Sequence, residues 1–111
     1  MARIVTVGIN GIQVAQDNPA RVGWQVIMPA TSIEAGNTGR VHVGKGFIPS
    51  TVVGAPDQGL ILTANSQVGE EKLYESDRSV FLGSIWLLAS IASQRVWVEE
   101  AISQEAPAPA G

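Results

Sequence analysis

The segment that decides the fold is residues 21–29, which read Arg21-Val22-Gly23-Trp24-Gln25-Val26-Ile27-Met28-Pro29. Every second side chain from Val22 through Val26 to Met28 is apolar, while the side chains between them are mixed. A period of two is typical of a strand with one buried face, so we expect Val22, Trp24 and Met28 to point into a core. Pro29 ends the strand because proline has no backbone N–H to give to a sheet.

Short apolar segments of the same kind precede and follow this strand. Turn-forming residues separate them, among them Asn10-Gly11, Asp17-Asn18-Pro19 and the loop expected at 31–39. Seven or eight short strands at this spacing, with no long amphipathic helix to connect parallel strands, predict an all-β fold, either a small antiparallel β-sandwich or a small barrel. The other segments that we interpret as strands are 4–9, 12–14, 40–44, 60–63 and 94–100.

Residues 79–92 fit two structures. Ile85, Leu88 and Ala92 would share a helical face, but apolar residues also recur at every second position from Ile85 to Ala89. The strands expected on both sides favour a strand here, covered on both of its faces.

The composition points to packing and contact rather than to chemistry. The 111 residues include no cysteine and one histidine, 15% of them are charged and 45% are hydrophobic. One domain is expected at this length, because two smaller pieces could not each bury a core without disulfides or metal. A small monomer usually carries charge on about 25–35% of its surface positions. The low charge and a mean hydropathy of +0.17 therefore predict that part of the surface is covered in an oligomer or a larger assembly.

Two classes of partner are disfavoured. The net charge is −3, and the seven Lys and Arg residues are scattered singly, so no basic stripe is available to bind a phosphate backbone. The longest apolar run, 84–92, is far shorter than the ~20 residues of a membrane span, and the first residues lack the layout of a signal peptide. We therefore expect neither nucleic acid nor a membrane as a partner.

Few residues could carry chemistry. His42 is the single imidazole, no cysteine or Gly-x-Ser-x-Gly sequence accompanies it, and we interpret it as structural or surface-exposed. The carboxylate pairs Glu70-Glu71 and Glu99-Glu100 would point to opposite faces of a strand, so we predict no metal site. The glycines of 36–39 and 44–46 resemble phosphate loops, but they fit hairpin turns better. We expect no catalytic residue, no cofactor and no metal.

Trp97 is the first candidate for a subunit contact. It alternates with Val96 and Val98 and shares its side of the strand with Arg95 and Glu99. It therefore either occupies an outer face or packs under the N-terminal arm or a loop. Tryptophan is enriched among the residues that dominate binding energy, which favours a contact role for Trp97 and its charged neighbours.

Two further groups complete the candidate interface. Lys45 lies between two glycines and would be exposed at a loop tip, where it could meet an acidic partner. Residues 1–17 form an expected N-terminal arm, whose apolar residues could add a strand to a neighbour's sheet. The arm candidates are Ile4, Val5 and Val7.

Several short motifs are spread over residues 18–100, namely Asn18-Pro19-Ala20-Arg21, Val41-His42-Val43-Gly44, Gly59-Leu60-Ile61-Leu62, Ile85-Trp86 and Val96-Trp97-Val98-Glu99-Glu100. Together they resemble small β-sandwich proteins of tailed bacteriophage virions. In size, in its Pro-Ala-rich tail and in its lack of catalytic residues, the chain is most similar to the capsid decoration (stapling or cement) proteins of short-tailed phages.

This resemblance implies a jelly-roll-like domain over residues 18–100, an extended arm at 1–17 and a mobile tail at 101–111. It implies a non-enzymatic protein, often a homodimer, that binds the outer surface of the phage head. There it would staple neighbouring major capsid subunits and so stabilise the shell against the internal DNA pressure. Assembly in the host cytoplasm and a final place on the capsid exterior are implied as well.

Two other functions use the same kind of fold. A head-fibre anchor or tail component of a phage virion needs the same composition, and a trimer in solution would favour it over a decoration protein. A carbohydrate-binding β-sandwich would need aromatic residues grouped on one exposed face, and only 5% of the residues are aromatic.

Overall fold

The part of the chain that the structure describes contains eight strands and the loops between them. The structure is a computed structural model, and it describes residues 2–64, 70–76 and 80–102. Those ranges contain no helix, and so none long and apolar enough to cross a membrane. The strands are β1 (Ala2–Val7), β2 (Ile12–Ala15), β3 (Arg21–Pro29), β4 (Arg40–Lys45), β5 (Leu60–Thr63), β6 (Glu70–Ser76), β7 (Ile85–Ala89) and β8 (Gln94–Ile102).

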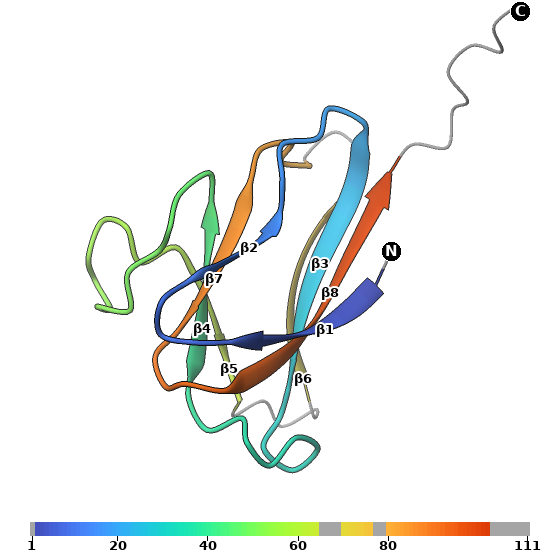
Figure 1. Ribbon diagram of the computed structural model, residues 1–111. Coiled ribbons are helices and arrows are strands. Elements are labelled where there is room, and N and C mark those ends of the chain that lie inside the picture. The colour runs from blue at the N-terminus through green and yellow to red at the C-terminus, as the bar shows by residue number, and fades with distance from the viewer. Residues whose placement is uncertain (1, 65–69, 77–79, 103–111) are drawn as a thin grey trace, which may run out of the picture.

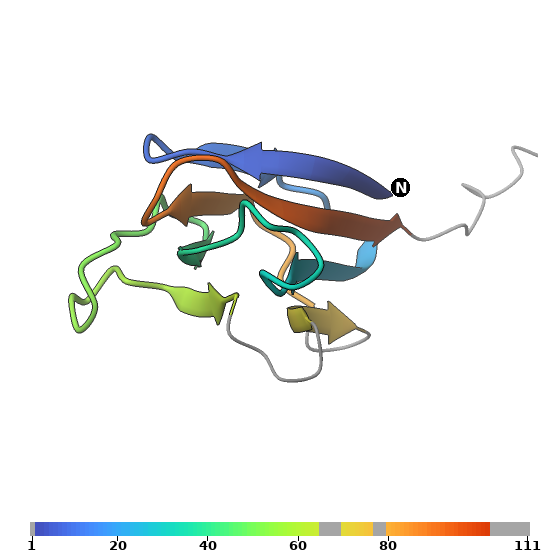
Figure 2. The same cartoon turned by 90° about the horizontal axis from the view of Figure 1, so that it is seen from below.

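The strands form two antiparallel sheets that pack face to face (Figure 1). Sheet A has the order β1-β8-β3-β6, and sheet B has the order β2-β7-β4-β5. The pairing is nested: the first strand pairs with the eighth, the second with the seventh, the third with the sixth and the fourth with the fifth. In Figure 2, β1 and β6 lie at opposite edges of sheet A. The predicted all-β antiparallel sandwich is confirmed.

The core lies between the sheets and is almost entirely aliphatic. Each strand turns alternate side chains inward, so the inner faces of the two sheets meet. Trp24, Val26 and Met28 supply the contribution of β3 and are at most 4% exposed, as the alternation predicts. The other aliphatic side chains of the core that are at most 1% exposed are Val7, Val41, Val43, Leu62, Ile85, Leu87, Ala89 and Val96.

One residue of the deciding segment faces the other way. Val22 is 43% exposed, although the alternation predicts it in the core. The register of β3 against β8 shifts between Arg21 and Gly23, so an irregularity resets the alternation at this point. Arg21 takes the inward position that Val22 was expected to fill.

The ends of the chain belong to the sandwich more fully than predicted. β1 pairs with β8 from Ala2 to Val7, so these residues form an edge strand of the domain and not a separate arm. β8 continues to Ile102, so residues 101 and 102 are strand and not tail. The rest of the predicted Pro-Ala-rich tail lies outside the described residues.

The ambiguous segment contains a strand, as we expected. In β7 the side chains of Ile85, Leu87 and Ala89 are buried in the core, and those of Trp86 and Leu88 are half-buried on the other face. The period of two therefore prevails over the helical pattern, because β2 and β4 pair with β7 on its two sides.

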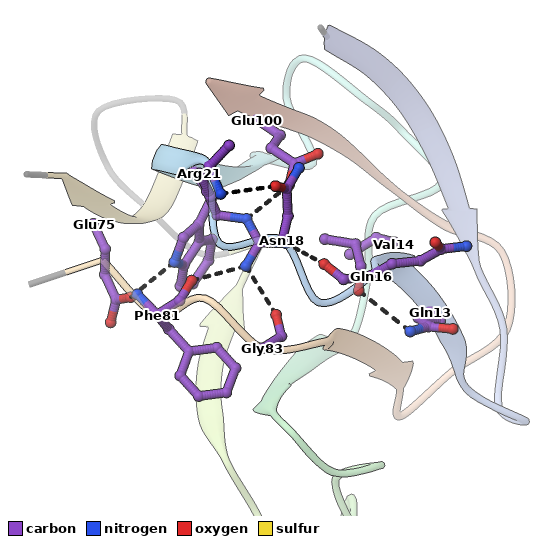
Figure 3. A network of polar contacts seen from close by, with 12 residues as sticks. Gln13, Val14, Gln16, Asn18, Arg21, Glu75, Phe81, Gly83 and Glu100 are labelled. Carbon is purple, nitrogen blue, oxygen red and sulfur yellow. Dashed lines mark hydrogen bonds and ion pairs between the residues drawn. The ribbon is translucent and has the colours of Figure 1, made fainter. Parts of the chain in front are cut away.

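Arg21 closes one end of the sandwich with a fully buried guanidinium (Figure 3). Its Nε donates to a carboxylate oxygen of Glu100 at 2.7 Å, and its Nη1 donates to the carbonyl oxygens of Phe81 and Gly83, each at 2.8 Å. Its Nη2 donates to the carbonyl oxygen of Gln16 at 2.5 Å. The side chain thus joins β3 to β8 and to the segments that follow β2 and precede β7. The burial of this charge is tolerated because it meets four acceptors.

Two buried amides close the opposite end. Asn37 donates to the carbonyl oxygens of Pro29 and Arg95 at 2.9 Å and accepts the backbone N–H of Arg95 at 2.7 Å. Gln94 accepts the backbone N–H groups of Thr38 and Gly39 at 2.9 Å. The loop between β3 and β4 is therefore fixed over the ends of β3 and β8.

Arg21→Met is expected to lower the free energy of unfolding by about 3 kcal/mol, because three carbonyl groups lose their donor and Glu100 loses a charged contact. The measurement is urea denaturation followed by tryptophan fluorescence. Arg95→Met is the matched control: the Arg95 side chain is 47% exposed and makes a 3.4 Å ion pair with Glu34, and its loss should cost about 0.5 kcal/mol or less. Equal losses in the two variants would contradict a structural role for the Arg21 network.

Candidate contact surface

The outer face of sheet A, which is turned away from sheet B, carries apolar side chains that follow one another across three strands. Ile4 of β1 lies opposite Trp97 of β8, and Trp97 lies opposite Ile27 of β3. Ile4 is 57% exposed, Trp97 is 40% exposed and Ile27 is half-buried. Side chains that lie directly opposite on neighbouring strands have Cβ atoms about 5 Å apart. These three residues therefore form one continuous apolar row, the outer row.

Polar side chains flank the outer row on both sides. Arg95 precedes Trp97 by two residues, so it projects from the same face, and its guanidinium makes a half-exposed ion pair with Glu34. Glu99 follows Trp97 by two residues and accepts a hydrogen bond from Gln25 Nε2 at 2.5 Å. An apolar centre with a polar rim is the usual anatomy of a protein contact surface.

A shallow pocket extends this face beyond Glu99. It has a volume of about 200 Å³, and Gly23, Tyr74 and Ala101 are among the residues that line it. Gly23 and Ala101 lie opposite each other in β3 and β8, and their small side chains leave the space open. Tyr74 is 67% exposed and supplies a second aromatic ring on the same face as Trp97.

The outer face of sheet B, in contrast, is partly covered by the loop of residues 46–59, which projects between β4 and β5 (Figure 1). A Cβ atom on Gly44 would collide with the carbonyl oxygen of Phe47, and one on Gly59 would collide with the carbonyl oxygen of Val43. Glycine at both positions therefore lets the loop lie directly on β4. The tip of the loop exposes Val52.

Four of the predicted contact residues lie together on sheet A. Trp97, Arg95 and Glu99 share the outer face of β8, and Ile4 extends it onto β1. Ile27 was not among the predicted contact residues, although the period of two places it on the outward face of β3, between the inward Val26 and Met28. Tyr74 was also absent from the predicted contact residues. It is the residue next to Leu73 in β6, and side chains alternate in exposure along this strand, so it points outward.

The structure does not support the prediction that Val5 and Val7 contact a partner. They are 7% and 0% exposed and belong to the core. The period of two in β1 explains the difference: Ile4 faces outward, so its neighbour Val5 faces inward, as does Val7. Neither side chain is available to a neighbouring protein in this fold.

The predicted position of Lys45 at an exposed loop tip is also wrong. It does not lie at a loop tip but is the last residue of β4, and Gly44 is part of the same strand, so 44–46 is not a hairpin turn. Its Nζ lies 2.6 Å from a carboxylate oxygen of Glu75 in sheet A and 5.8 Å from the centre of the Phe81 ring. Its charge is therefore neutralised within the chain.

Glu75 is the centre of this link between the two sheets. Its carboxylate accepts hydrogen bonds from Lys45 Nζ, from the Trp24 indole N–H at 2.8 Å and from the Phe81 backbone N–H at 2.8 Å. Burial by itself raises the pKa of Glu75, but these three hydrogen bonds and the charge of Lys45 outweigh it, so the pKa lies below its usual value of 4.5.

His42 has a structural position. The imidazole is completely buried, its Nδ1 lies 2.8 Å from the carbonyl oxygen of Gln58, and Arg40 Nε donates to its Nε2 at 3.4 Å. The ring therefore holds the 46–59 loop on β4. The described residues contain no group of three or more His, Cys, Asp or Glu side chains that could hold a metal ion.

No protein-family model, curated protein or solved structure matches this chain. The description of the contact surface therefore rests on the structure alone. It consists of the outer row, its charged rim and the pocket beside Tyr74.

Glu75→Gln is expected to flatten the acid limb of the stability profile. The folded-state pKa of Glu75 is lowered, so its carboxylate contributes stability that is fully present above the unfolded pKa of about 4.5 and is lost as the pH falls through the folded pKa. Glutamine has no such proton to gain. The free energy of unfolding, measured from about pH 6 to about pH 3, should fall less steeply in the variant than in the wild type.

Glu34→Gln is the control for this measurement, because it removes a carboxylate from the more exposed ion pair with Arg95. Its profile should keep the wild-type slope. Parallel profiles for Glu75→Gln and the wild type would show that the link between the sheets does not couple folding to protonation of Glu75.

Proposed function

We propose that this protein is a non-enzymatic structural component of a tailed-phage virion, which binds the outer surface of the head and staples neighbouring major capsid subunits. The observation that carries the proposal is the outer face of sheet A, where an exposed apolar row lies within a charged rim. In the described chain the 46–59 loop covers part of sheet B, whereas no such loop covers this face of sheet A. A surface of this kind is suited to contact and not to bond-breaking chemistry.

The strand order supports the same class of function. The nested pairing of eight strands in two sheets supports a jelly-roll-like arrangement, and jelly rolls are found in viral capsid proteins and in lectins. The low charge adds to this support, because a surface with few charges is normally covered by a partner. The partner that we propose, the major capsid protein lattice, comes from the resemblance of short sequence motifs to phage-virion proteins.

Stapling of this kind acts through linkage. A protein that binds the assembled lattice but not free capsid subunits stabilises the assembled state by mass action. Contacts that are individually weak add over many copies, because each is repeated on the lattice. In this proposal Trp97 supplies buried apolar area, and Arg95 and Glu99 orient the contact. The protein would be made in the host cytoplasm, act as a homodimer and reside on the capsid exterior.

A carbohydrate-binding module is the second candidate, and one observation favours it. Trp97 and Tyr74 are both exposed on the outer face of sheet A, next to the shallow pocket. They lie two strands and two residues apart, which places their Cα atoms roughly 12 Å from each other. Aromatic rings on one face can stack on successive sugar rings. A head-fibre anchor could use the same surface of this protein. A trimer in solution would distinguish that function from decoration.

Trp97→Ala is expected to weaken binding to emptied heads of the corresponding phage, stripped of surface proteins, by about 30-fold or more, the usual effect of losing a dominant contact residue. The measurement is co-sedimentation over a range of protein concentrations. The wild-type protein should also raise the temperature at which the heads disrupt. Trp86→Ala is the matched control, because Trp86 is half-buried on the outer face of sheet B, and it should leave head binding unchanged.

Three results would count against the proposal. Wild-type protein that does not co-sediment with the heads would exclude decoration. Trp97→Ala protein that loses stability but keeps wild-type binding would remove Trp97 from the contact surface. Quenching of tryptophan fluorescence by polysaccharide, absent in Trp97→Ala, would favour the carbohydrate-binding module.

A further inference from the structure

We propose that the free edge of β1 pairs antiparallel with β1 of a second copy of this chain, so that the two copies of sheet A form one continuous sheet of eight strands. β1 ends sheet A, and its strand partner is β8. An uncovered edge presents unpaired N–H and C=O groups that can pair with another strand. The question is which of the four edges of the sandwich is built to accept one.

Three of the four edges have features that discourage pairing. β6 carries four charged residues among seven, so a second copy of this acidic strand would be repelled. β2 has four residues and a register shift between Gln13 and Ala15. β5 also has four residues, and the carboxylate of Glu71 accepts its Thr63 N–H at 3.0 Å.

β1 has none of these features. It pairs with β8 over six residues without a register shift and contains no proline. Its single charged side chain, Arg3, is directed within its own chain, where Nη2 donates to the carbonyl oxygen of Val14 at 2.7 Å. β1 is thus a regular strand, rich in β-branched residues and with an exposed isoleucine. Of the four edges it is the one that best accommodates a second strand.

The pleat of the sheet limits how two β1 strands can pair. Side chains opposite each other in an antiparallel pair point to the same face, so outward residues must lie opposite outward residues. One arrangement places Ile4 opposite the second copy's Ile4 on the twofold axis, with Ala2 opposite Thr6. We assign this register, because it buries the most exposed apolar side chain of β1 against itself.

This dimer extends the outer row. The rows of the two copies join through Ile4 and become a stripe of six apolar side chains, with the two Trp97 residues on either side of the axis. At about 4.8 Å between strands the stripe is roughly 24 Å long. Its use as a two-headed staple rests on the function proposed above, whereas the dimer itself rests on the edge of β1. A bivalent contact of this kind can bridge two neighbouring subunits of a lattice.

The test uses the natural lack of cysteine in the chain. In the assigned register the Cα atoms of the two Ile4 residues lie about 5 Å apart, within the range of a disulfide. The Cα atoms of the two Thr6 residues lie about 14 Å apart, well outside that range. Ile4→Cys protein should therefore cross-link to a dimer on mild oxidation, and Thr6→Cys protein, the matched control on the same face, should not.

Light scattering during size-exclusion chromatography provides the second readout, and it is made without capsids. The wild type should have twice the monomer mass of 11.7 kDa. Ile4→Lys should have the monomer mass, because two lysines would meet on the axis. It should still unfold in one cooperative urea transition, because the side chain is exposed in the monomer.

A monomeric wild type would overturn the proposal. A dimer that survives Ile4→Lys, together with an Ile4→Cys variant that does not cross-link, would place the dimer contact elsewhere and overturn it as well. A monomeric wild type that loses head binding on Ile4→Lys would place Ile4 in the contact with the head and not in a dimer. A β1 dimer that fails to bind heads would leave this inference standing and remove the proposed function.

Discussion

The buried guanidinium of Arg21 is the interaction on which the rest of the sandwich depends. Two packed sheets bury their faces easily, but the ends between them expose backbone groups and the rim of the core. Arg21 fills one end and satisfies carbonyl groups from two connecting segments together with a carboxylate of β8. Asn37 and Gln94 do the same at the other end. Among the described residues, no buried side-chain nitrogen or oxygen lacks a hydrogen-bond partner.

With both ends of the sandwich closed, the two outer faces of the sheets remain, and they differ in how far the chain covers them. Sheet B is partly covered by its own 46–59 loop, which glycines at 44 and 59 allow to approach β4 closely and which His42 holds in place. Sheet A has no such cover in the described chain, and its apolar side chains are held at fixed spacing by regular strand pairing. A surface that is rigid before it binds loses little conformational entropy on binding. The fold therefore suits the outer row to contact a large, regular partner.

Much of the fold follows from the period of two. The alternation places Trp24, Val26 and Met28 inward, as the structure confirms. For Trp97 the pattern left two places open, an outer face or a site under the N-terminal arm or a loop, and the structure shows the outer face. The pattern fails where the register shifts, because nothing in the local sequence reports an irregularity that depends on β8. This is why Val22 was expected inside.

The polar links were beyond a reading of the sequence for a related reason. Arg21 reads as one of seven scattered basic residues, and its acceptors lie as far away as Glu100. Lys45 reads as an exposed loop residue, because its partner Glu75 is thirty positions away and in the other sheet. Such pairs are set by topology and not by local pattern. The outer row was found only in part for the same reason, since Ile27 becomes significant only when β8 and β1 lie beside it.

The nested strand order also has a consequence for the order in which the protein can fold. β8 lies between β1 and β3 and is the last of the eight described strands, so sheet A has no centre until that strand has been synthesised. Pairing of β1 with β8 joins residues more than eighty positions apart, and contacts of such separation make folding slow. While β8 is still missing, β1 and β3 both present unpaired edges. The nascent chain is therefore most prone to self-association in the period before β8 has been synthesised.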